Sequence, residues 1–357
     1  MSNARPRSVS VVALLADIPT TGQLGDAQAR RFPLDGPDLA TQADAFLDFA
    51  GGHLAAGRKV VALYPKWRAE RARRAIRFAR GSFRTDHIAA VEVDLSPLAF
   101  SLMADQLAYL APYLPSGLIA ALADELQRHI LAGAWLKNVG NLSTIPITVG
   151  QHMGSYAPKV TFLAVSAPVQ QVGRVRRGDP TPNIPFRPVD PVQMLVSAGG
   201  GADTESFDSR FLPALQPVSA QKLPEQPLGA EYWGSSKYIE FVAFSAHQDS
   251  LTRPAHAVRP TACAWCREPV TAAQCPFCRA VNQRPAGRPP SYSRAAQVPA
   301  PTQPAPARPG ASAPMDGLPG RPASSLLPAG GETAGDGRVD HGNVDPHLHA
   351  PSQPVRR

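Results

Sequence analysis

The sequence contains little cysteine: only four of its 357 residues are Cys, and all four lie between Cys263 and Cys278. No other thiol is left to act as a catalytic nucleophile. No apolar run reaches the roughly 18 residues that indicate a membrane-spanning helix. The chain also lacks Walker-type Gly-Lys, G-x-G-x-x-G and G-x-S-x-G motifs. These absences exclude the common nucleotide-binding and serine-hydrolase signatures.

The four cysteines form two C-x-x-C pairs, Cys263 with Cys266 and Cys275 with Cys278. Four thiolates satisfy the tetrahedral coordination that Zn²⁺ prefers, and each pair presents two of them to one metal. The spacing therefore predicts a structural zinc site with these four residues as ligands. Two disulfides, a redox-active pair and an iron site are alternatives that use the same residues.

The cysteine segment resembles the short zinc-ribbon modules of bacterial proteins, in which two knuckles hold one ion. The resemblance rests on a repeated Cys-x-aromatic-Cys-Arg pattern and covers only Thr261 to Arg279. Such knuckles usually place Gly after the second cysteine, whereas this chain has Arg267 and Arg279. Because Gly adopts positive φ without steric cost, we expect a strained or altered turn at both arginines. Trp265 and Phe277 are expected to cover the metal, with recognition of a partner as the alternative.

Composition divides the chain into three parts. Fifteen of the 39 prolines lie after Gln283, among Ala, Gly, Ser and Arg. Such a segment buries too little apolar surface to offset chain entropy, so residues 283–357 are predicted to be disordered. We expect an α/β globular domain over residues 1–255, a zinc ribbon over 261–280 and then this tail.

The first half of the predicted domain alternates strand and helix patterns, which indicates an α/β fold with a βαβαβ-type parallel sheet. Strands are expected at Ser8–Leu15, Lys59–Tyr64 and Ile88–Val93, and helices at Asp38–Ala56 and Lys66–Arg80. Two further helices are expected, from Pro97 with Ser96 as N-cap to Leu110, and from Ser116 to Leu136. From about residue 140 the chain is β-rich, with strands predicted at 145–149, 159–167, 192–198 and 238–246.

The densest charge cluster lies on the second predicted helix. Arg73, Arg77 and Arg80 recur at helical spacing, with Arg84 beyond them, and such a stripe suits contact with phosphates. A solvated outer helix face is the alternative. The formal net charge of +8 does not by itself indicate nucleic-acid binding, because residues 1–255 carry only +3 of it.

Acidic residues follow two of the predicted parallel strands. Asp17 comes after the first strand and Asp94 after the third, with Tyr64 at the end of the second. Ligands of open α/β sheets bind beyond the carboxyl ends of the strands. Asp17 and Asp94 are therefore candidates for Mg²⁺ binding or acid–base catalysis, although Asp is also a common capping residue in strand-to-helix turns.

These features together favour a non-enzymatic, cytoplasmic zinc-binding adapter, with another protein as its partner and no membrane association. One alternative is an enzyme that acts on a phosphate-bearing substrate through Asp17 and Asp94. Another is a nucleic-acid-binding protein that uses the ribbon and the helix at 66–80. The sequence leans against an enzyme because no catalytic motif accompanies the two aspartates.

Overall fold

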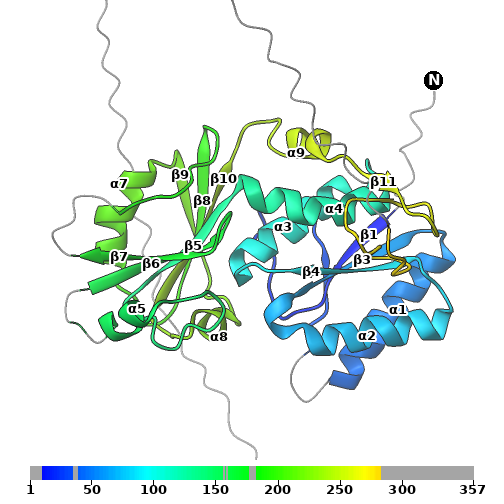
Figure 1. Cartoon of the computed structure of the whole chain (residues 1–357), viewed down its shortest axis with the longest axis horizontal. Coiled ribbons are helices and arrows are strands. Elements are labelled where there is room, and N and C mark those ends of the chain that lie inside the picture. Colours follow the sequence, from blue (N-terminus) through cyan, green and yellow to red (C-terminus); the bar gives the residue numbers. More distant parts are fainter. Residues whose placement is uncertain (1–9, 35–38, 156, 158–159, 177–181, 283–357) are drawn as a thin grey trace, which may run out of the picture. The chain divides into compact units, whose positions relative to one another are not determined.

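The computed structural model describes residues 10–34, 39–155, 157, 160–176 and 182–282, all of which belong to one compact unit, residues 1–291. The tail predicted to be disordered, 283–357, lies outside the described residues. The fold is α/β, with a parallel sheet followed by a mixed sheet (Figure 1). In the described residues no helix combines the length and the apolar character needed to cross a membrane.

The first sheet is parallel and has the strand order β2-β1-β3-β4. Its strands are β1 (Ser10–Leu14), β2 (Arg30–Arg31), β3 (Lys59–Pro65) and β4 (Ile88–Val93). Helices α1 (Leu39–Ala55) and α2 (Ala69–Phe83) cover one face, while α3 (Pro97–Leu110) and α4 (Ser116–Leu126) cover the other. The two central strands, β1 and β3, are mostly apolar and buried, as predicted for a parallel sheet that is covered on both faces.

Successive side chains of β1 point to opposite faces of the sheet, and they illustrate this arrangement. Val12 and Leu14 pack with the α3 and α4 side chains, whereas Ala13 packs with those of α1 and α2. Gly57, with φ at +72°, lies just beyond the end of α1, as its position in the sequence predicted. Helix α2 continues through Gly81 and ends only at Arg84, which adopts the left-handed conformation.

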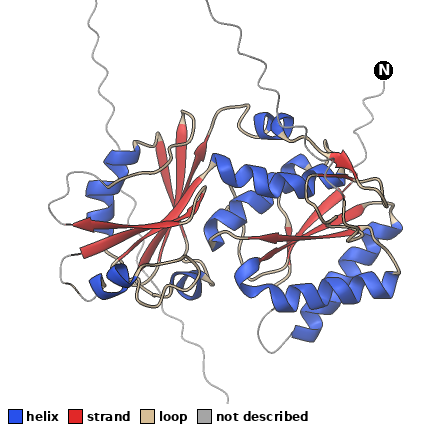
Figure 2. Cartoon of the chain, in the orientation of Figure 1, coloured by secondary structure: helices blue, strands red, loops and turns tan. Residues whose placement is uncertain are grey.

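The second sheet has six strands in the order β7-β6-β5-β10-β8-β9, antiparallel except for the β8–β9 pair. The strands are β5 (Leu131–Leu136), β6 (Val160–Ala167), β7 (Gln171–Arg176), β8 (Val192–Ala198), β9 (Ser219–Leu223) and β10 (Tyr238–Ser245). Figure 2 shows short helices flanking this sheet. They are α5 (Val149–Gly154), α6 (Thr204–Ser206), a π-helical turn (Phe207–Phe211), α7 (Leu212–Leu215) and α8 (Gly229–Trp233).

Two of the predicted elements differ in the structure. Helix α4 ends at Leu126, and Leu131–Leu136 forms the fully buried strand β5 instead of the end of that helix. A continuous apolar run fits a buried helix and a buried strand equally well, so periodicity could not separate them. The segment 145–149 is also no strand. It leads into α5, which Thr148 and Gln151 cap reciprocally.

A buried carboxylate joins the second sheet to the start of α3. Glu240 of β10 is fully buried, and its Oε1 accepts the backbone N–H of Leu98 at 2.8 Å. Ser96, the expected N-cap, makes no capping bond and instead lies 3.3 Å from the hydroxyl of Ser166. Glu240 therefore takes over the capping role from a distant strand. Burial raises its pKa to about 7, against smaller lowerings by the Leu98 N–H and by the side chains of Ser96 and Trp233.

Candidate functional site

The cysteine segment packs against the edge of the parallel sheet. It contains the short hairpin of β11 (Thr261–Ala262) and β12 (Pro269–Val270), and Cys263, Cys275 and Phe277 belong to the same apolar core as α3 and α4. The carbonyl of Pro276 accepts the N–H of Ala90 on β4 at 2.9 Å. The segment thus continues the hydrogen bonding of the sheet at one position of its edge strand.

The four thiols are free and lie together. Their Sγ atoms are all within 4.8 Å of one another, and the Cys263–Cys278 and Cys266–Cys275 pairs are each separated by 3.6 Å. Tetrahedral Zn²⁺ with Zn–S bonds of about 2.3 Å would hold its sulfurs about 3.8 Å apart. The geometry of the donor set therefore fits zinc.

The two knuckles have matching backbones. Arg267 and Arg279 have φ values of 64° and 65°, and their N–H groups donate to Cys263 and Cys275. Both arginines therefore adopt the conformation in which Gly is ordinarily favoured, which is the strained turn expected from the sequence. The aromatic positions differ, because Phe277 is 1% exposed whereas Trp265 is 78% exposed. Only Phe277 covers the cysteine cluster in the way we expected.

A second set of contacts fixes the segment to α4. Glu268 pairs with Lys59 through one carboxylate oxygen and accepts the N–H of Gly117 at 3.0 Å through the other. A Cβ on Gly117 would lie 2.2 Å from the carbonyl oxygen of Pro269. Glycine at position 117 therefore permits the close approach of the cysteine segment to α4.

This close approach yields a testable prediction. Gly117→Ala should destabilise the protein by about 1–3 kcal/mol, because the new methyl group meets backbone rather than a mobile side chain. Gly81→Ala is the matched control, since Gly81 lies within helix α2 with no atom near its missing Cβ. Its better helix propensity should leave stability unchanged or raise it by up to about 1 kcal/mol. Chemical denaturation measures both, and equal stability of the two variants would contradict the tight packing.

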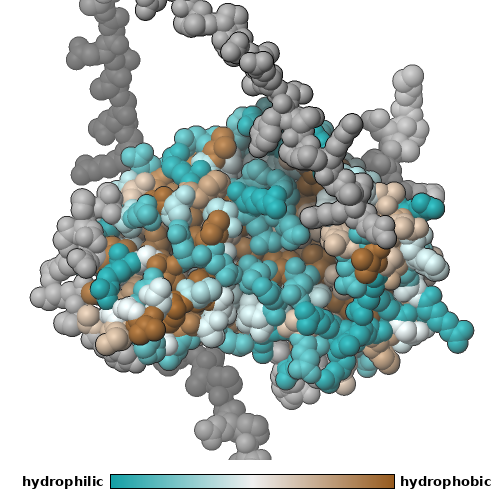
Figure 3. Space-filling model, viewed as in Figure 1, coloured by the Kyte–Doolittle hydropathy of each residue, from teal (hydrophilic) through white to brown (hydrophobic). Residues whose placement is uncertain are grey.

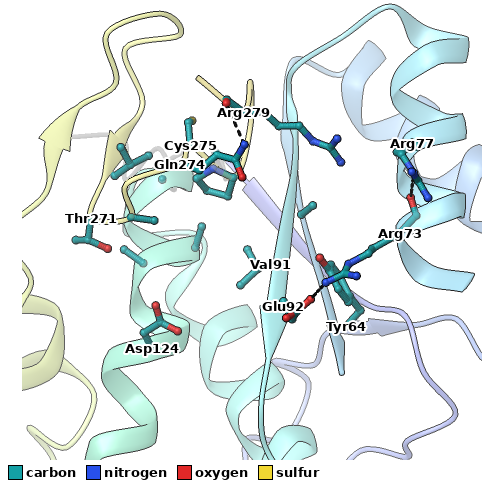
Figure 4. Close-up of a pocket in the computed structure, with 17 residues that line it drawn as sticks. Tyr64, Arg73, Arg77, Val91, Glu92, Asp124, Thr271, Gln274, Cys275 and Arg279 are labelled. Carbon is teal, nitrogen blue, oxygen red and sulfur yellow. Dashed lines mark hydrogen bonds and ion pairs between the residues drawn. The ribbon is translucent and has the colours of Figure 1, made fainter. Parts of the chain in front are cut away.

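A polar groove of about 560 Å³ lies between the edge of β4, helices α2 and α4, and the cysteine segment. Figure 4 shows Asp124 on the α4 side, Arg73 and Arg77 on the α2 side, and Val91 and Glu92 of β4 between them. Arg73 pairs with Glu92 and lies over the ring of Tyr64. We call this cavity the polar groove.

A second cavity, of about 210 Å³, is mostly apolar. It lies between the ends of α3, α4 and β10, the loop at 186–189, and helix α9 (Thr252–Ala257). Its apolar lining residues are Leu126, Ile130, Phe186, Val189, Phe244, Leu251 and Pro254. His129, His247 and Arg253 add nitrogen-bearing side chains to the same wall. We call it the apolar cavity.

The predicted phosphate-binding stripe is not a set of free cations. Helix α2 buries Ala69, Ala72, Ile76 and Ala79, and hydrophilic residues gather where it lies in Figure 3. Arg80, however, donates to the carbonyls of Ile88 and Pro276, and Arg73 is paired with Glu92. Burial lowers the pKa of Arg80, with a further contribution from Arg279. Two of the three predicted contacts therefore hold the fold together.

The two aspartates at the strand ends do not form a site in the structure. Asp94 is paired with Lys66 at 2.8 Å, and Asp17 is exposed. Among the described residues, neither belongs to a group of side chains that could hold a metal ion. Neither of the two cavities above includes them in its lining.

Comparison with known proteins gives structural matches alone. No family model matches the sequence, and no curated protein matches it. A DegV family protein from Corynebacterium glutamicum matches over 69% of this chain and 99% of its own, with 16% identity and a TM-score of 0.46. A stearic-acid-binding protein from Eubacterium ventriosum matches over 66% of this chain and 98% of its own, with 11% identity and a TM-score of 0.46. A DegV family protein from Thermus thermophilus, described as binding fatty acid, matches over 66% of this chain and 99% of its own, with 14% identity and a TM-score of 0.45.

The function predicted from the sequence has to be corrected. A zinc-binding adapter that engages a protein partner through a separate ribbon is wrong, because Cys263, Cys275 and Phe277 of the cysteine segment are buried in the same core as α3 and α4. The two alternatives fit no better. The enzyme would need Asp17 and Asp94 as a joint site, and the nucleic-acid-binding protein would need Arg73 and Arg80 free of the contacts described above.

Sequence reasoning missed both cavities, because each combines residues from distant segments. One local signal was present for the polar groove. Gly117, Ala120, Ala121 and Asp124 recur at helical spacing, so they form a stripe of small residues that ends in a carboxylate. No comparable pattern in the sequence indicates the apolar cavity.

Proposed function

We propose that this protein binds a small amphiphile with a carboxylate headgroup, of the fatty-acid class, in the apolar cavity. The observation that carries the proposal is the lining of that cavity, in which seven apolar side chains adjoin His129, His247 and Arg253. An acyl chain gains free energy by leaving water for such a lining, while a carboxylate is favoured beside a guanidinium. Ligand sites are commonly built in this way, from apolar walls with a few polar groups.

The rim of the cavity supports this orientation of the ligand. Arg253 is an exposed side chain whose partner, Asp249, lies 3.8 Å away, a loose ion pair at the surface. Such pairs contribute little free energy, so a ligand carboxylate can compete for the guanidinium. Gln106, on α3, is 7% exposed and adds a buried amide to the wall.

The experiment is titration of the full chain with decanoate, followed by isothermal calorimetry. Ser250→Trp fills the cavity from its rim and should weaken decanoate binding at least about tenfold, because the acyl chain loses its buried contacts. Arg253→Gln should weaken it by removing the charge partner of the headgroup. Val218→Trp is the matched control, since Val218 is 66% exposed and lies outside both cavities. Binding that survives Ser250→Trp unchanged, or no saturable binding at all, would overturn the proposal.

The proposal also includes a structural zinc ion held by Cys263, Cys266, Cys275 and Cys278. The separation of the sulfurs supports it, and zinc would supply the cross-link that so small a segment lacks. Because zinc-bound cysteines must stay reduced, this part of the proposal agrees with the expected cytoplasmic location. No reaction is assigned to the metal.

A further inference from the structure

The polar groove has features that an acyl-chain site does not need, and the first is a free strand edge. Strand β4 is the outermost strand of its sheet, and Ala90 and Glu92 direct their backbone groups away from β3. The N–H of Ala90 is taken by Pro276. In the described structure, the C=O of Ala90 and the N–H and C=O of Glu92 have no backbone partner outside the sheet, and they face the groove.

The second feature is an unpaired carboxylate at one side. Asp124 ends the small-residue stripe of α4, so Gly117, Ala120 and Ala121 leave open the space beside it. No hydrogen bond or ion pair joins its carboxylate to another described residue. Asp124 is an exposed residue, and partial desolvation by neighbouring atoms raises its pKa, against a smaller lowering by Arg128.

The third feature is a pair of guanidinium groups on the side of the groove away from Asp124 (Figure 4). Arg77 uses its Nε to donate to the carbonyl of Arg73, which leaves its terminal nitrogens unused. Arg279, held by its left-handed backbone, has a guanidinium without a partner in the described part of the chain. The strained knuckle therefore directs a cation toward the groove.

We infer that the polar groove binds a small zwitterion of the amino-acid or dipeptide class. Its carboxylate is held by Arg77 and Arg279, its ammonium group by Asp124, and its amide by the free edge of β4. An extended amide offers one donor and one acceptor, which is the pattern that a strand edge presents. This site is separate from the apolar cavity and does not depend on the proposed fatty-acid ligand.

A simple anion such as inorganic phosphate fits the groove less well. It would satisfy Arg77 and Arg279 but would leave the carboxylate of Asp124 and the acceptors of β4 facing another negative charge. Like charges repel, so a plain anion would gain attraction from the two guanidinium groups and lose part of it beside the carboxylate. The mixture of charges in the groove therefore favours a ligand that carries both signs.

The experiment uses the full chain and the dipeptide Ala-Ala, compared with N-acetyl-Ala-Ala and Ala-Ala amide, by calorimetric titration at pH 7. Each blocked form loses one charge, so each should bind at least about tenfold more weakly than Ala-Ala. Asp124→Asn should abolish the difference between Ala-Ala and its N-acetyl form. Arg279→Gln should reduce the difference between Ala-Ala and its amide in the same way.

Arg74→Gln is the matched control, because Arg74 lies on α2 but pairs with Glu70 outside the groove. It should leave all three affinities unchanged, and circular dichroism should find every variant folded. Equal affinity for the free and blocked dipeptides, or no saturable binding, would overturn the inference. Phosphate binding that is tighter than that of Ala-Ala and insensitive to Asp124→Asn would overturn it in favour of a plain anion site.

Discussion

Removal of the proposed zinc should release the cysteine segment from the parallel sheet. We expect purified protein to contain one zinc per chain and the Cys263→Ser/Cys275→Ser double variant to contain none. Binding of zinc to such sites contributes up to about 10–16 kcal/mol in isolated zinc-finger peptides, so the loss should be large. Because three core residues of the segment, Cys263, Cys275 and Phe277, pack with α3 and α4, the effect should extend beyond the segment itself.

Hydrogen exchange gives the most specific measurement of that loss. The amide of Ala90 donates to Pro276, and the amide of Gly117 donates to Glu268, so both acceptors belong to the segment. Both amides should lose protection when zinc is removed by chelation or by the double variant. The amide of Val242, in β10, one of the two central strands of the second sheet, should keep its protection.

Trp265→Ala provides the control within the same segment. Trp265 is 78% exposed, so its removal should leave both the zinc content and the exchange of Ala90 unchanged. Protein purified without stoichiometric zinc would contradict the metal assignment. Unchanged protection of Ala90 in the double variant would show instead that packing alone holds the segment in place.

The sequence predicted the parallel half of the fold because its signals there are local. Continuous apolar strands, the break at Gly57 and the paired cysteines each act within a few residues. The change from α4 to β5 was missed because Ile130 to Leu136 is apolar throughout, which fits a buried helix as well as a buried strand. Contacts between residues that are far apart in the sequence could not be predicted. The polar groove joins Arg77, Asp124 and Arg279, and no spacing in the chain indicates that these residues meet.

Glu240 gave a signal that sequence reasoning did not use. It is the single acidic residue in an otherwise apolar or aromatic strand pattern, YIEFVAFS. A buried carboxylate is rare unless it has a partner, so its presence in such a strand indicates a specific acceptor role. The partner itself, the N–H of Leu98, is 142 positions away and could come only from the structure.

Because Glu240 is buried and favours its protonated form, the protein should be more stable in mildly acidic solution than at neutral pH and above. Its pKa is raised from 4.5 to about 7 in the folded state. Its contribution to stability is therefore fully present below about pH 4.5 and is lost as the pH rises through 7, where the folded state must ionise a buried group. A shift of this size corresponds to about 3 kcal/mol between the two limits.

Glu240→Gln isolates this charge, because the amide oxygen can still accept the N–H of Leu98. The variant should match or exceed the wild type in free energy of unfolding above pH 7, and its stability should vary less between pH 4.5 and 7. Glu240→Ala should instead be less stable at every pH, by about 1–3 kcal/mol, since the N–H of Leu98 is left without its acceptor. Glu205→Gln, at an exposed position on α6, should change neither limit. Parallel pH profiles for the wild type and Glu240→Gln would mean that Glu240 titrates in the folded protein as it does in the unfolded chain. The complete burial of Glu240 argues against that result, because ionisation would place a charge where water cannot solvate it.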